Sequence, residues 1–354
     1  MADLPGQLTE QEIWAQPRLW ADVLASFRRH LPQLTELWRS AAPDQVLLTG
    51  CGSSYYLALS AAHLLQAALR VPCRAFPSSE VLFAGEGMRV WTRPPLLIAI
   101  SRSGETTETV WALQRLREQG ATTVALTCSE GGALSRASDL PITLPVEEHS
   151  VVMTGSFTSM LLALAALAAT LSGDVGAVEG LHQAPGLAAR DLSALVDRAR
   201  AFAGAASRTY VYLGSGPLYG IACEGALKMT EMALVPGYAY HTLEYLHGPK
   251  AAVSPQTVVI GLLSSRGSPY EAQVLKHLAD LGAVVIAVGA PVESLPAVRF
   301  TAEMGTVPAM LLAGLWMQLL ALYVARARGV DPDAPRYLQP VVTWDTSLQI
   351  GGAR

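Results

Sequence analysis

The stretch Val46-Leu-Leu-Thr-Gly-Cys-Gly52 decides the fold, because it returns in the second half of the chain as Val211-Tyr-Leu-Gly-Ser-Gly216. Each copy is an apolar run that ends in a Gly-x-Gly turn, and a segment of helical composition follows each. Self-similarity of this kind is the signature of a repeated structural unit. The chain is therefore predicted to contain the same unit twice.

Two further pairs of apolar runs extend the repeat. Residues 96–101 match 258–264, and residues 123–128 match 284–288; a helix-like stretch ending in glycine precedes each run of the second pair. Long apolar segments, residues 156–171 and 304–325, close the two units. Unbroken Val, Ile and Leu runs that alternate with helices predict parallel strands covered on both faces. We therefore expect an α/β fold of two tandem doubly wound, flavodoxin-like domains.

The length of 354 residues agrees with two domains, because single hydrophobic cores usually stop growing before that size. The segment from about 172 to 207, rich in Gly, Ala and Asp, is predicted to join them. The expected boundaries are a helical N-terminal arm over residues 1–40, a first domain over 41–190, a second over 191–335 and a tail over 336–354 that closes on the active site.

Composition excludes several classes of partner. Hydrophobic residues make up 51% of the chain and charged residues 15%, and the net charge is −4 with no run of Lys or Arg. Neither nucleic acid nor an anionic membrane is therefore an expected partner. The four cysteines form no C-x-x-C pair, which argues against a disulfide framework and a zinc site, so no metal or cofactor is expected.

Residues 304–325 lack charge and are long enough to span a bilayer. Pro308, Gly314 and Gln318 interrupt this segment, and the first unit holds a similar segment at the equivalent place, so we expect a buried helix instead. The N-terminus shows no basic region followed by an apolar core, and a cytoplasmic location is predicted.

A polar loop, Ser101-Arg-Ser-Gly-Glu-Thr106, follows an apolar run of the first unit, where a strand should turn into a helix. Free backbone N–H groups and the positive end of the helix dipole point at such a turn, and Ser101, Ser103 and Thr106 add hydroxyl donors. The alternative is an ordinary Ser or Thr cap at the helix N-terminus. Because ligands of doubly wound folds gather at the carboxyl ends of strands, we predict that this loop binds phosphate.

The stretch Gly50-Cys-Gly-Ser-Ser54 resembles half of a dinucleotide fingerprint, but no third glycine follows at the required spacing, and we reject an NAD site. A tight turn between strand and helix explains its glycines. The hydroxyl groups of Ser53 and Ser54 are then free to face the same cleft, where they suit a sugar phosphate.

Two further motifs carry titratable groups. Helical spacing places Glu224, Lys228 and Glu231 near one face of a predicted helix, which is either an exposed salt-bridged face or part of a site. The segment His247-Gly-Pro-Lys250 holds an imidazole and an ammonium on a turn. His247 is a structural histidine or an acid/base candidate.

Taken together, these motifs resemble the double sugar-isomerase (SIS) domain proteins, in particular the isomerase half of glutamine–fructose-6-phosphate aminotransferase. The likeness covers nearly the whole chain. Glu12-Ile-Trp-Ala-Gln-Pro17 is similar to the motif that opens that half, and the serine-rich, Glu224 and His247 motifs follow in family order. The resemblance implies that the substrate phosphate lies among Ser54, Ser101, Arg102, Ser103 and Thr106, with Ser53 and Val151 nearby.

The resemblance also implies catalytic roles. Glu231 would be the base that moves a proton between C1 and C2 through an enediol-like or enolamine-like intermediate, and Lys228 would neutralise the developing oxyanion. His247 resembles the residue that opens the sugar ring, which in this family comes from the neighbouring subunit. A homodimer with shared active sites is therefore expected.

Two departures from the synthase argue against the synthase reaction for this chain. The chain starts at the sugar-binding part, so neither a glutaminase domain nor an N-terminal cysteine nucleophile is expected. In the tail motif Arg336-Tyr-Leu-Gln-Pro-Val-Val-Thr343, Pro340 stands where the synthase has its imine-forming lysine, and proline cannot form that imine. The sequence does not indicate what Lys250 does in the site.

Residues 151–157 and 247–250 resemble amino-sugar phosphate deaminases and ketose/aldose isomerases more closely. The predicted function is thus a phosphosugar aldose-ketose isomerase that deaminates a hexosamine 6-phosphate, of the glucosamine 6-phosphate type, to a ketose 6-phosphate and ammonia. The alternatives are a deglycase of amino-acid–phosphosugar adducts, an aminotransferase-like activity and a non-catalytic sugar-phosphate sensor.

Overall fold

The computed structural model describes residues 4–84, 87, 91–204, 209–264, 267–300 and 305–344. The first unit holds a sheet of five parallel strands in the order β2-β1-β3-β4-β5, which is the flavodoxin-like order. The strands are β1 (Val46–Gly50), β2 (Cys73–Pro77), β3 (Leu96–Ile100), β4 (Thr122–Thr127) and β5 (Leu140–Thr143). The helices are α3 (Ser53–Leu69), α4 (Ser78–Ala84), α5 (Thr107–Glu118), α6 (Ala133–Ala137) and α7 (Gly155–Ser172).

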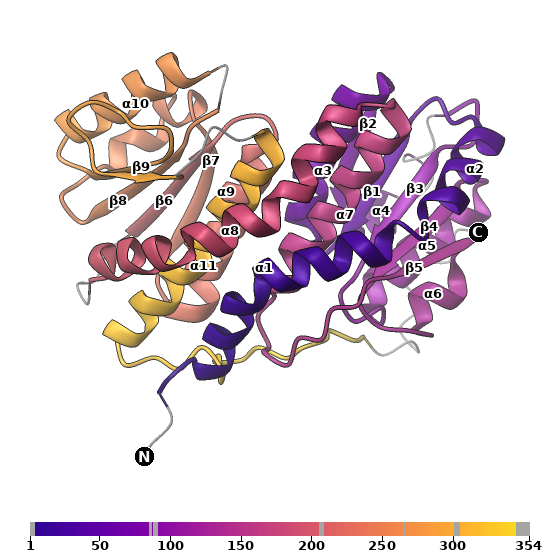
Figure 1. The fold of residues 1–354 in the computed structure, drawn as a ribbon, viewed down its shortest axis with the longest axis horizontal. Helices are drawn as coiled ribbons and strands as arrows, with labels where there is room; N and C mark the ends of the chain where they lie inside the picture. The colour runs from indigo at the N-terminus through magenta and orange to yellow at the C-terminus, as the bar shows by residue number, and fades with distance from the viewer. Residues whose placement is uncertain are drawn as a thin grey trace.

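The second unit repeats this topology, with parallel strands in the order β10-β9-β8-β6-β7 (Figure 1). Its strands are β6 (Thr209–Gly214), β7 (Gly237–His241), β8 (Thr257–Leu262), β9 (Val284–Gly289) and β10 (Ala297–Arg299). Its helices are α9 (Leu218–Ala233), α10 (Ser268–Asp280), α11 (Thr306–Ala327) and two short 3₁₀ turns, η2 (Glu244–Leu246) and η3 (Pro249–Ala252). The predicted fold class is confirmed, and the two sheets share one strand order.

The sequence revealed the central strands but not the edges. In β1, β3 and β8 every residue is buried, so continuous apolar runs mark them. The edge strand β2 instead has only Phe76 fully buried. A half-exposed strand tolerates polar residues, and its apolar pattern is correspondingly weak.

Two long helices, one near the N-terminus and one in the predicted join, tie the units together. Helices α1 (Gln7–Phe27) and α2 (Leu31–Ala41) form the predicted N-terminal helical segment, and α1 packs against α7, α8 and α11. Most of the predicted join is a single helix, α8 (Val175–Phe202), which runs past both units (Figure 1). The last residues of that join, 205–207, lie outside the described residues. The domain boundaries given above remain predictions.

The expectation of a buried apolar helix near residues 304–325 is confirmed for the described residues 305–325. Helices α7 and α11 are both long and apolar enough to cross a membrane, yet 83% and 89% of their most apolar windows are buried within the protein. They pack against α3, α8 and α9 between the two sheets. Both are core helices.

Close packing of α3 against α9 brings the two units into contact beside the pocket. A Cβ on Gly220 of α9 would lie 2.3 Å from the carbonyl oxygen of Tyr56 on α3, so only glycine permits this approach. Ser60 of α3 donates a hydrogen bond to the carbonyl oxygen of Pro217, 2.7 Å away. The start of α3 and the polar face of α9 are therefore held next to each other.

Candidate active site

A polar pocket of about 200 Å³ lies at the carboxyl ends of β1 and β3. These strands flank the point where the chain order of the first sheet reverses, which is where doubly wound folds bind their ligands. The predicted residues that line it are Ser53, Ser54, Ser101, Arg102, Ser103, Thr106, Val151 and Glu231. The structure thus brings together the whole predicted phosphate set and the predicted base.

The turn after β1 places two serines at this pocket. Gly52 has a φ of 54°, a conformation that favours glycine, and a Cβ on Gly50 would meet the Cβ of Ser54 at 2.8 Å. Ser53 and Ser54 begin α3 and are buried. The glycines therefore serve the tight turn, as predicted.

The loop after β3 gathers three hydroxyl groups. The Oγ of Ser101 lies 3.1 Å from the Oγ1 of Thr106 and 3.4 Å from the Oγ of Ser103. Thr106 is the residue before α5, but within this fully described helix its side chain makes no capping hydrogen bond. Its hydroxyl faces Ser101 instead, which favours the anion-binding interpretation over the ordinary cap.

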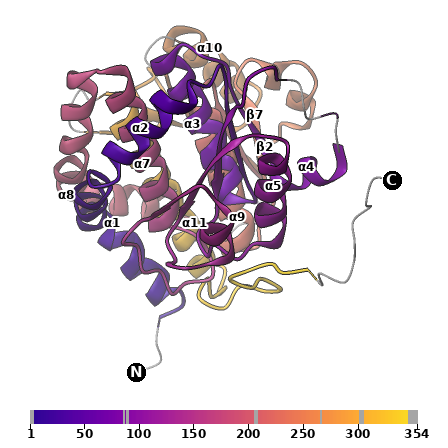
Figure 2. The same ribbon diagram turned by 90° about the vertical axis from the view of Figure 1, so that its right-hand side faces the viewer.

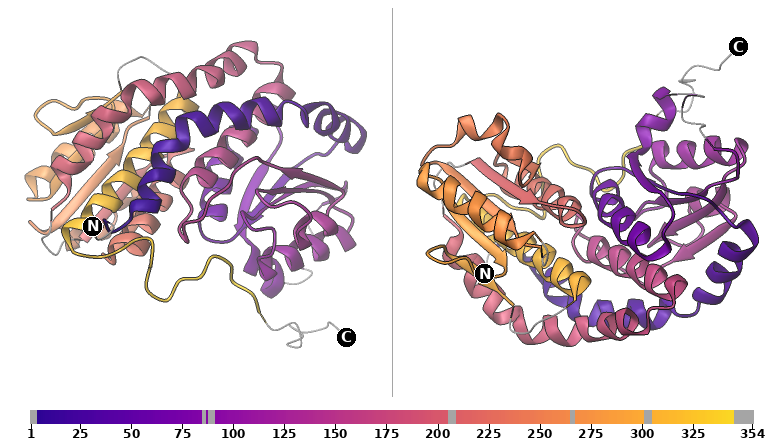
Figure 3. Two further views of the ribbon diagram at one scale, coloured as in Figure 1. Left: turned by 60° about the horizontal axis from the view of Figure 1, so that its bottom comes forward. Right: turned by 90° about the horizontal axis from the view of Figure 1, so that it is seen from above.

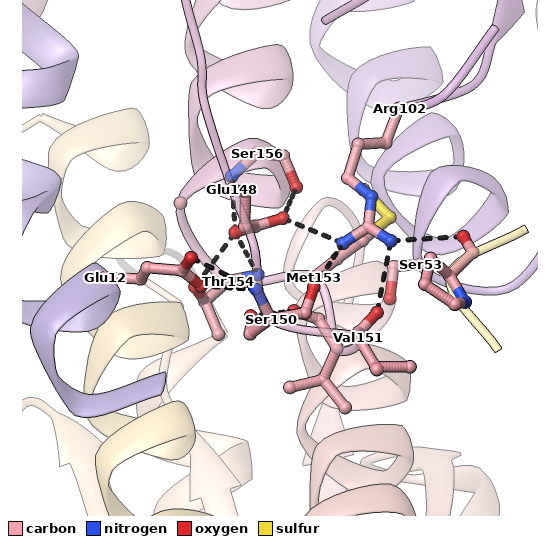
Figure 4. Close-up of polar contacts among 12 residues, drawn as sticks. Glu12, Ser53, Arg102, Glu148, Ser150, Val151, Met153, Thr154 and Ser156 are labelled. Atoms are coloured by element: carbon pink, nitrogen blue, oxygen red, sulfur yellow. Dashed lines mark hydrogen bonds and ion pairs between the residues drawn. The ribbon is translucent and has the colours of Figure 1, made fainter. Parts of the chain in front are cut away.

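Arg102 lines the pocket but directs its guanidinium to the protein (Figure 4). Its Nη1 lies 3.1 Å from Glu148 Oε2 and from the carbonyl oxygen of Ser150, and its Nη2 lies 3.1 Å from the carbonyl oxygens of Val151 and Pro340. Both terminal nitrogens are therefore engaged. In this structure Arg102 fastens three segments to one another.

Two carboxylates also hold the loop around residues 149–154, to which Arg102 donates hydrogen bonds (Figure 4). Glu148 Oε1 accepts hydrogen bonds from the backbone N–H of Thr154 at 2.8 Å and from its hydroxyl at 2.9 Å. Glu12, from the N-terminal motif, accepts from the backbone N–H groups of His149 at 2.5 Å and Ser150 at 3.1 Å, and burial raises its pKa. Glu12 of the N-terminal motif thus holds the backbone of the loop that also contacts Arg102.

The helix α9 contributes a buried charged cluster. The Nζ of Lys228 lies 2.5 Å from Glu231 Oε2 and 3.4 Å from Glu224 Oε1. The predicted common face is confirmed, but the exposed salt-bridged alternative is wrong: the side chains of Glu224 and Lys228 are each 1% exposed and that of Glu231 is 20%. Among these three, Glu231 is the one that lines the pocket.

Charge pairing offsets the cost of burial here. Burial lowers the proton affinity of Lys228, but Glu224 and Glu231 more than compensate, so its pKa is raised and it remains an ammonium. Burial raises the pKa of Glu224 to about 7, against the opposing effect of Lys228. Its Oε2 is buried without a hydrogen-bond partner within the described residues.

His247 lies apart from this pocket. It follows η2, is exposed, and is absent from the described residues that line the pocket. The segment is not a simple loop, because Lys250 belongs to the 3₁₀ turn η3. The expectation that His247 acts in a neighbouring subunit stays a prediction.

The tail crosses from the second unit to the first (Figure 2 and Figure 3). Gln339, Pro340 and Val342 line the pocket, so Pro340 stands beside the serine cluster. Farther on, the Nε1 of Trp344 donates to Glu108 Oε1 at 2.7 Å. The described part of the tail therefore lines the pocket; residues 345–354 of the predicted tail lie outside the described residues.

Sequence reasoning missed two acidic residues near this site and gave no role to a third. Glu108 lines the pocket, at the start of α5, and its Oε2 is buried without a partner within the described residues. Glu148 pairs with Arg102, and Glu224 pairs with Lys228. Sequence spacing gave no signal for Glu148, because its partner Arg102 lies 46 residues away.

In the second unit a carboxylate occupies the equivalent strand end. Glu271 of α10 accepts from the backbone N–H of Ser264 at 2.7 Å and from its hydroxyl at 3.1 Å. The backbone N–H and hydroxyl of Ser264, which could bind an external anion, thus bind a carboxylate of the protein itself. Across the described ranges, no cluster of three His, Cys, Asp or Glu residues suits a metal ion.

Fold and pocket together define a tandem doubly wound α/β protein with a pocket at the strand ends of its first unit. The SIS domain model matches residues 41–171 and 205–324, in agreement with the two units. The chain belongs to the SIS, or sugar isomerase, domain family.

Named relatives fall within sugar-phosphate chemistry. A glutamine–fructose-6-phosphate aminotransferase of Pyrobaculum aerophilum is 32% identical over 94% of this chain, which spans 57% of that protein's length. A glucosamine-6-phosphate deaminase structure from Thermotoga maritima is 30% identical with a TM-score of 0.76, over 91% of this chain and 99% of that one. A tagatose-6-phosphate ketose/aldose isomerase from Escherichia coli is 25% identical with a TM-score of 0.83, over 93% and 95%.

Proposed function

We propose that the chain is a phosphosugar aldose-ketose isomerase that deaminates a hexosamine 6-phosphate to a ketose 6-phosphate and ammonia. The observation that carries this proposal is that a carboxylate, Glu231, lines the same pocket as the hydroxyl cluster of Ser54, Ser101 and Thr106. One end of the pocket suits a phosphate and the other offers a base. The similarity to the Thermotoga deaminase over nearly its whole length supports the same reaction.

The geometry suggests how the reaction proceeds. With the phosphate held by the hydroxyl groups and by the N-terminal end of α5, Glu231 removes the C2 proton of the open-chain aldose. The resulting enolamine receives a proton at C1 and becomes a ketimine at C2. Water adds to the ketimine, and ammonia leaves. Lys228, 2.5 Å from Glu231, supplies positive charge beside the developing oxyanion.

Pro340 argues against the synthase version of this chemistry. It lines the pocket at the place where the synthase resemblance expects an imine-forming lysine, and its carbonyl oxygen is held by Arg102. A proline offers no amine for an imine. The deaminase and the simple isomerase need no such lysine.

Ring opening completes the proposal. His247 is exposed on the second unit, away from the pocket of its own chain, which suits an imidazole that completes the site of a second copy. We infer a homodimer with shared active sites in the cytoplasm.

Assay of ammonia release from glucosamine 6-phosphate tests this function directly. We expect turnover by the wild-type protein and a loss of about 10²–10⁴-fold in kcat for Glu231→Gln, the range typical of a lost general base. The control is Glu179→Gln, an exposed glutamate on α8 outside the pocket, with wild-type activity expected. Absence of turnover on every hexosamine 6-phosphate would eliminate the deaminase, and tight binding without any turnover would favour the sensor.

A further inference from the structure

One buried contact links the two units through the active site. The Oγ of Ser53, at the start of α3 in the first unit, donates to Glu224 Oε1 of α9 in the second unit over 3.1 Å. The same oxygen lies 3.4 Å from Lys228, whose Nζ contacts Glu231. A continuous polar chain thus runs from a hydroxyl in the pocket to the proposed base.

Glu224 is placed at the centre of this chain without access to the substrate. Its side chain is 1% exposed and is not among the described groups that line the pocket. The titratable groups that face it are Lys228 and Glu231 on its own helix, the adjacent Cys223, and Tyr56 on α3. Two carboxylates therefore compete for one ammonium.

We propose that Glu224 is a positioning residue that divides the positive charge of Lys228 with Glu231 and thereby sets the strength of Glu231 as a base. This inference rests on the proposed function for its kinetic consequence. When Glu224 is ionised, Lys228 serves two carboxylates. When Glu224 is neutral, the whole ammonium charge acts on Glu231, which then holds a proton less readily.

The surroundings of Glu224 allow both states. One oxygen is held by Ser53 and Lys228, while Oε2 is buried without a partner in the described structure, and this favours a proton. The pKa of about 7 means that Glu224 changes charge near neutral pH. Ser53 also lines the pocket, so a ligand that takes its hydroxyl would remove a donor from Glu224 and favour the neutral state.

Glu224→Gln tests the kinetic consequence. The amide keeps the size and the acceptor for Ser53 but removes the competing charge. We expect the acid limb of the kcat profile to move to lower pH by about one unit, with a lower plateau, because an opposite charge shifts a carboxyl by about that much or more. A group with a merely structural role would leave the limb in place. Glu271→Gln is the matched control, since Glu271 is a buried carboxylate outside this site.

A double-mutant cycle tests the same link without any turnover. Glu224→Gln and Glu231→Gln each leave Lys228 one carboxylate, whereas the double variant leaves a buried ammonium with neither. Each substitution raises the unfolding equilibrium constant by some factor relative to the wild type. We expect the factor for the double variant to exceed the product of the two single-variant factors by about tenfold. Additive effects would overturn the shared-charge proposal, even if turnover fails and the proposed function is wrong. An unmoved pH limb in an active Glu224→Gln enzyme would overturn it as well.

Discussion

At the scale of single residues, burial decides the chemistry of the carboxylates in α9. Glu224 and Glu231 are two turns apart on one helix, yet the first is enclosed and the second reaches the pocket. The sequence marks both as acids. The packing of α3 over α9 separates the positioning role proposed for Glu224 from the catalytic role proposed for Glu231.

The raised pKa of Glu224 makes stability depend on pH. Its ordinary pKa is 4.5 and the folded value is about 7, so the folded state binds the proton more tightly. The resulting contribution to stability is present below the ordinary value and is lost as pH rises through the folded value. The free energy of unfolding of Glu224→Gln, taken relative to that of the wild type at the same pH, should therefore be higher at pH 8 than at pH 5. Urea unfolding at both values measures this, and an equal difference at the two would contradict it.

At the scale of elements, the first helix depends on a distant cap. The carboxylate of Asp333 accepts from the backbone N–H groups of Leu8 at 2.8 Å and Thr9 at 2.9 Å, and from the Thr9 hydroxyl at 2.6 Å. It takes the place of a local cap for α1, across more than 300 residues of sequence. The segment after α11 is thereby attached to the start of the chain.

Asp333→Ala should lower the free energy of unfolding by about 1–2 kcal/mol, because it leaves N-terminal N–H groups of α1 without acceptors. Denaturant titration measures the change. The control is Asp44→Ala, an exposed residue, for which a change within about 0.5 kcal/mol is expected. Equal effects of the two substitutions would argue against the cap.

The tail is the second element whose place depends on distant contacts. Arg102 holds the carbonyl oxygen of Pro340, and Trp344 donates to Glu108. Arg102→Ala removes the first contact and also the Arg102 contacts to Glu148 and to the loop before α7. We expect faster proteolysis within residues 337–344 and a higher KM for sugar phosphate with a smaller change in kcat. Trp344→Phe keeps an aromatic ring but loses the Nε1 donor, so it should show a smaller increase in both proteolysis and KM. Unchanged proteolysis in Arg102→Ala would contradict the role of Arg102 in holding the tail.

At the scale of the whole molecule, the position of His247 predicts complementation between subunits. Glu231→Gln and His247→Ala should each be inactive alone. In a mixed dimer, one of the two sites combines an intact Glu231 with an intact His247 from the other subunit. Mixing the two variants under exchange conditions should therefore restore about one quarter of wild-type activity, as random pairing in a twofold dimer requires. No recovery from mixtures that form hybrid dimers would contradict shared sites.

What the sequence determined by itself follows from local and periodic patterns. Paired apolar runs specified two parallel sheets, because a strand buried on both faces leaves a continuous hydrophobic signal. The serine-rich loop indicated an anion site, since hydroxyl and backbone donors at a strand end form a local motif. Helical spacing correctly placed Glu224, Lys228 and Glu231 on one face.

Only the tertiary structure decided the rest. The engagement of Arg102 with Glu148 and Pro340, the cap from Asp333, and the Ser53–Glu224 contact all join residues far apart in the chain. Such contacts depend on how elements pack, and burial sets the proton affinity of each carboxyl only after the packing exists. The sequence could therefore indicate which residues form the pocket, but not which of them face the ligand and which hold the others in place.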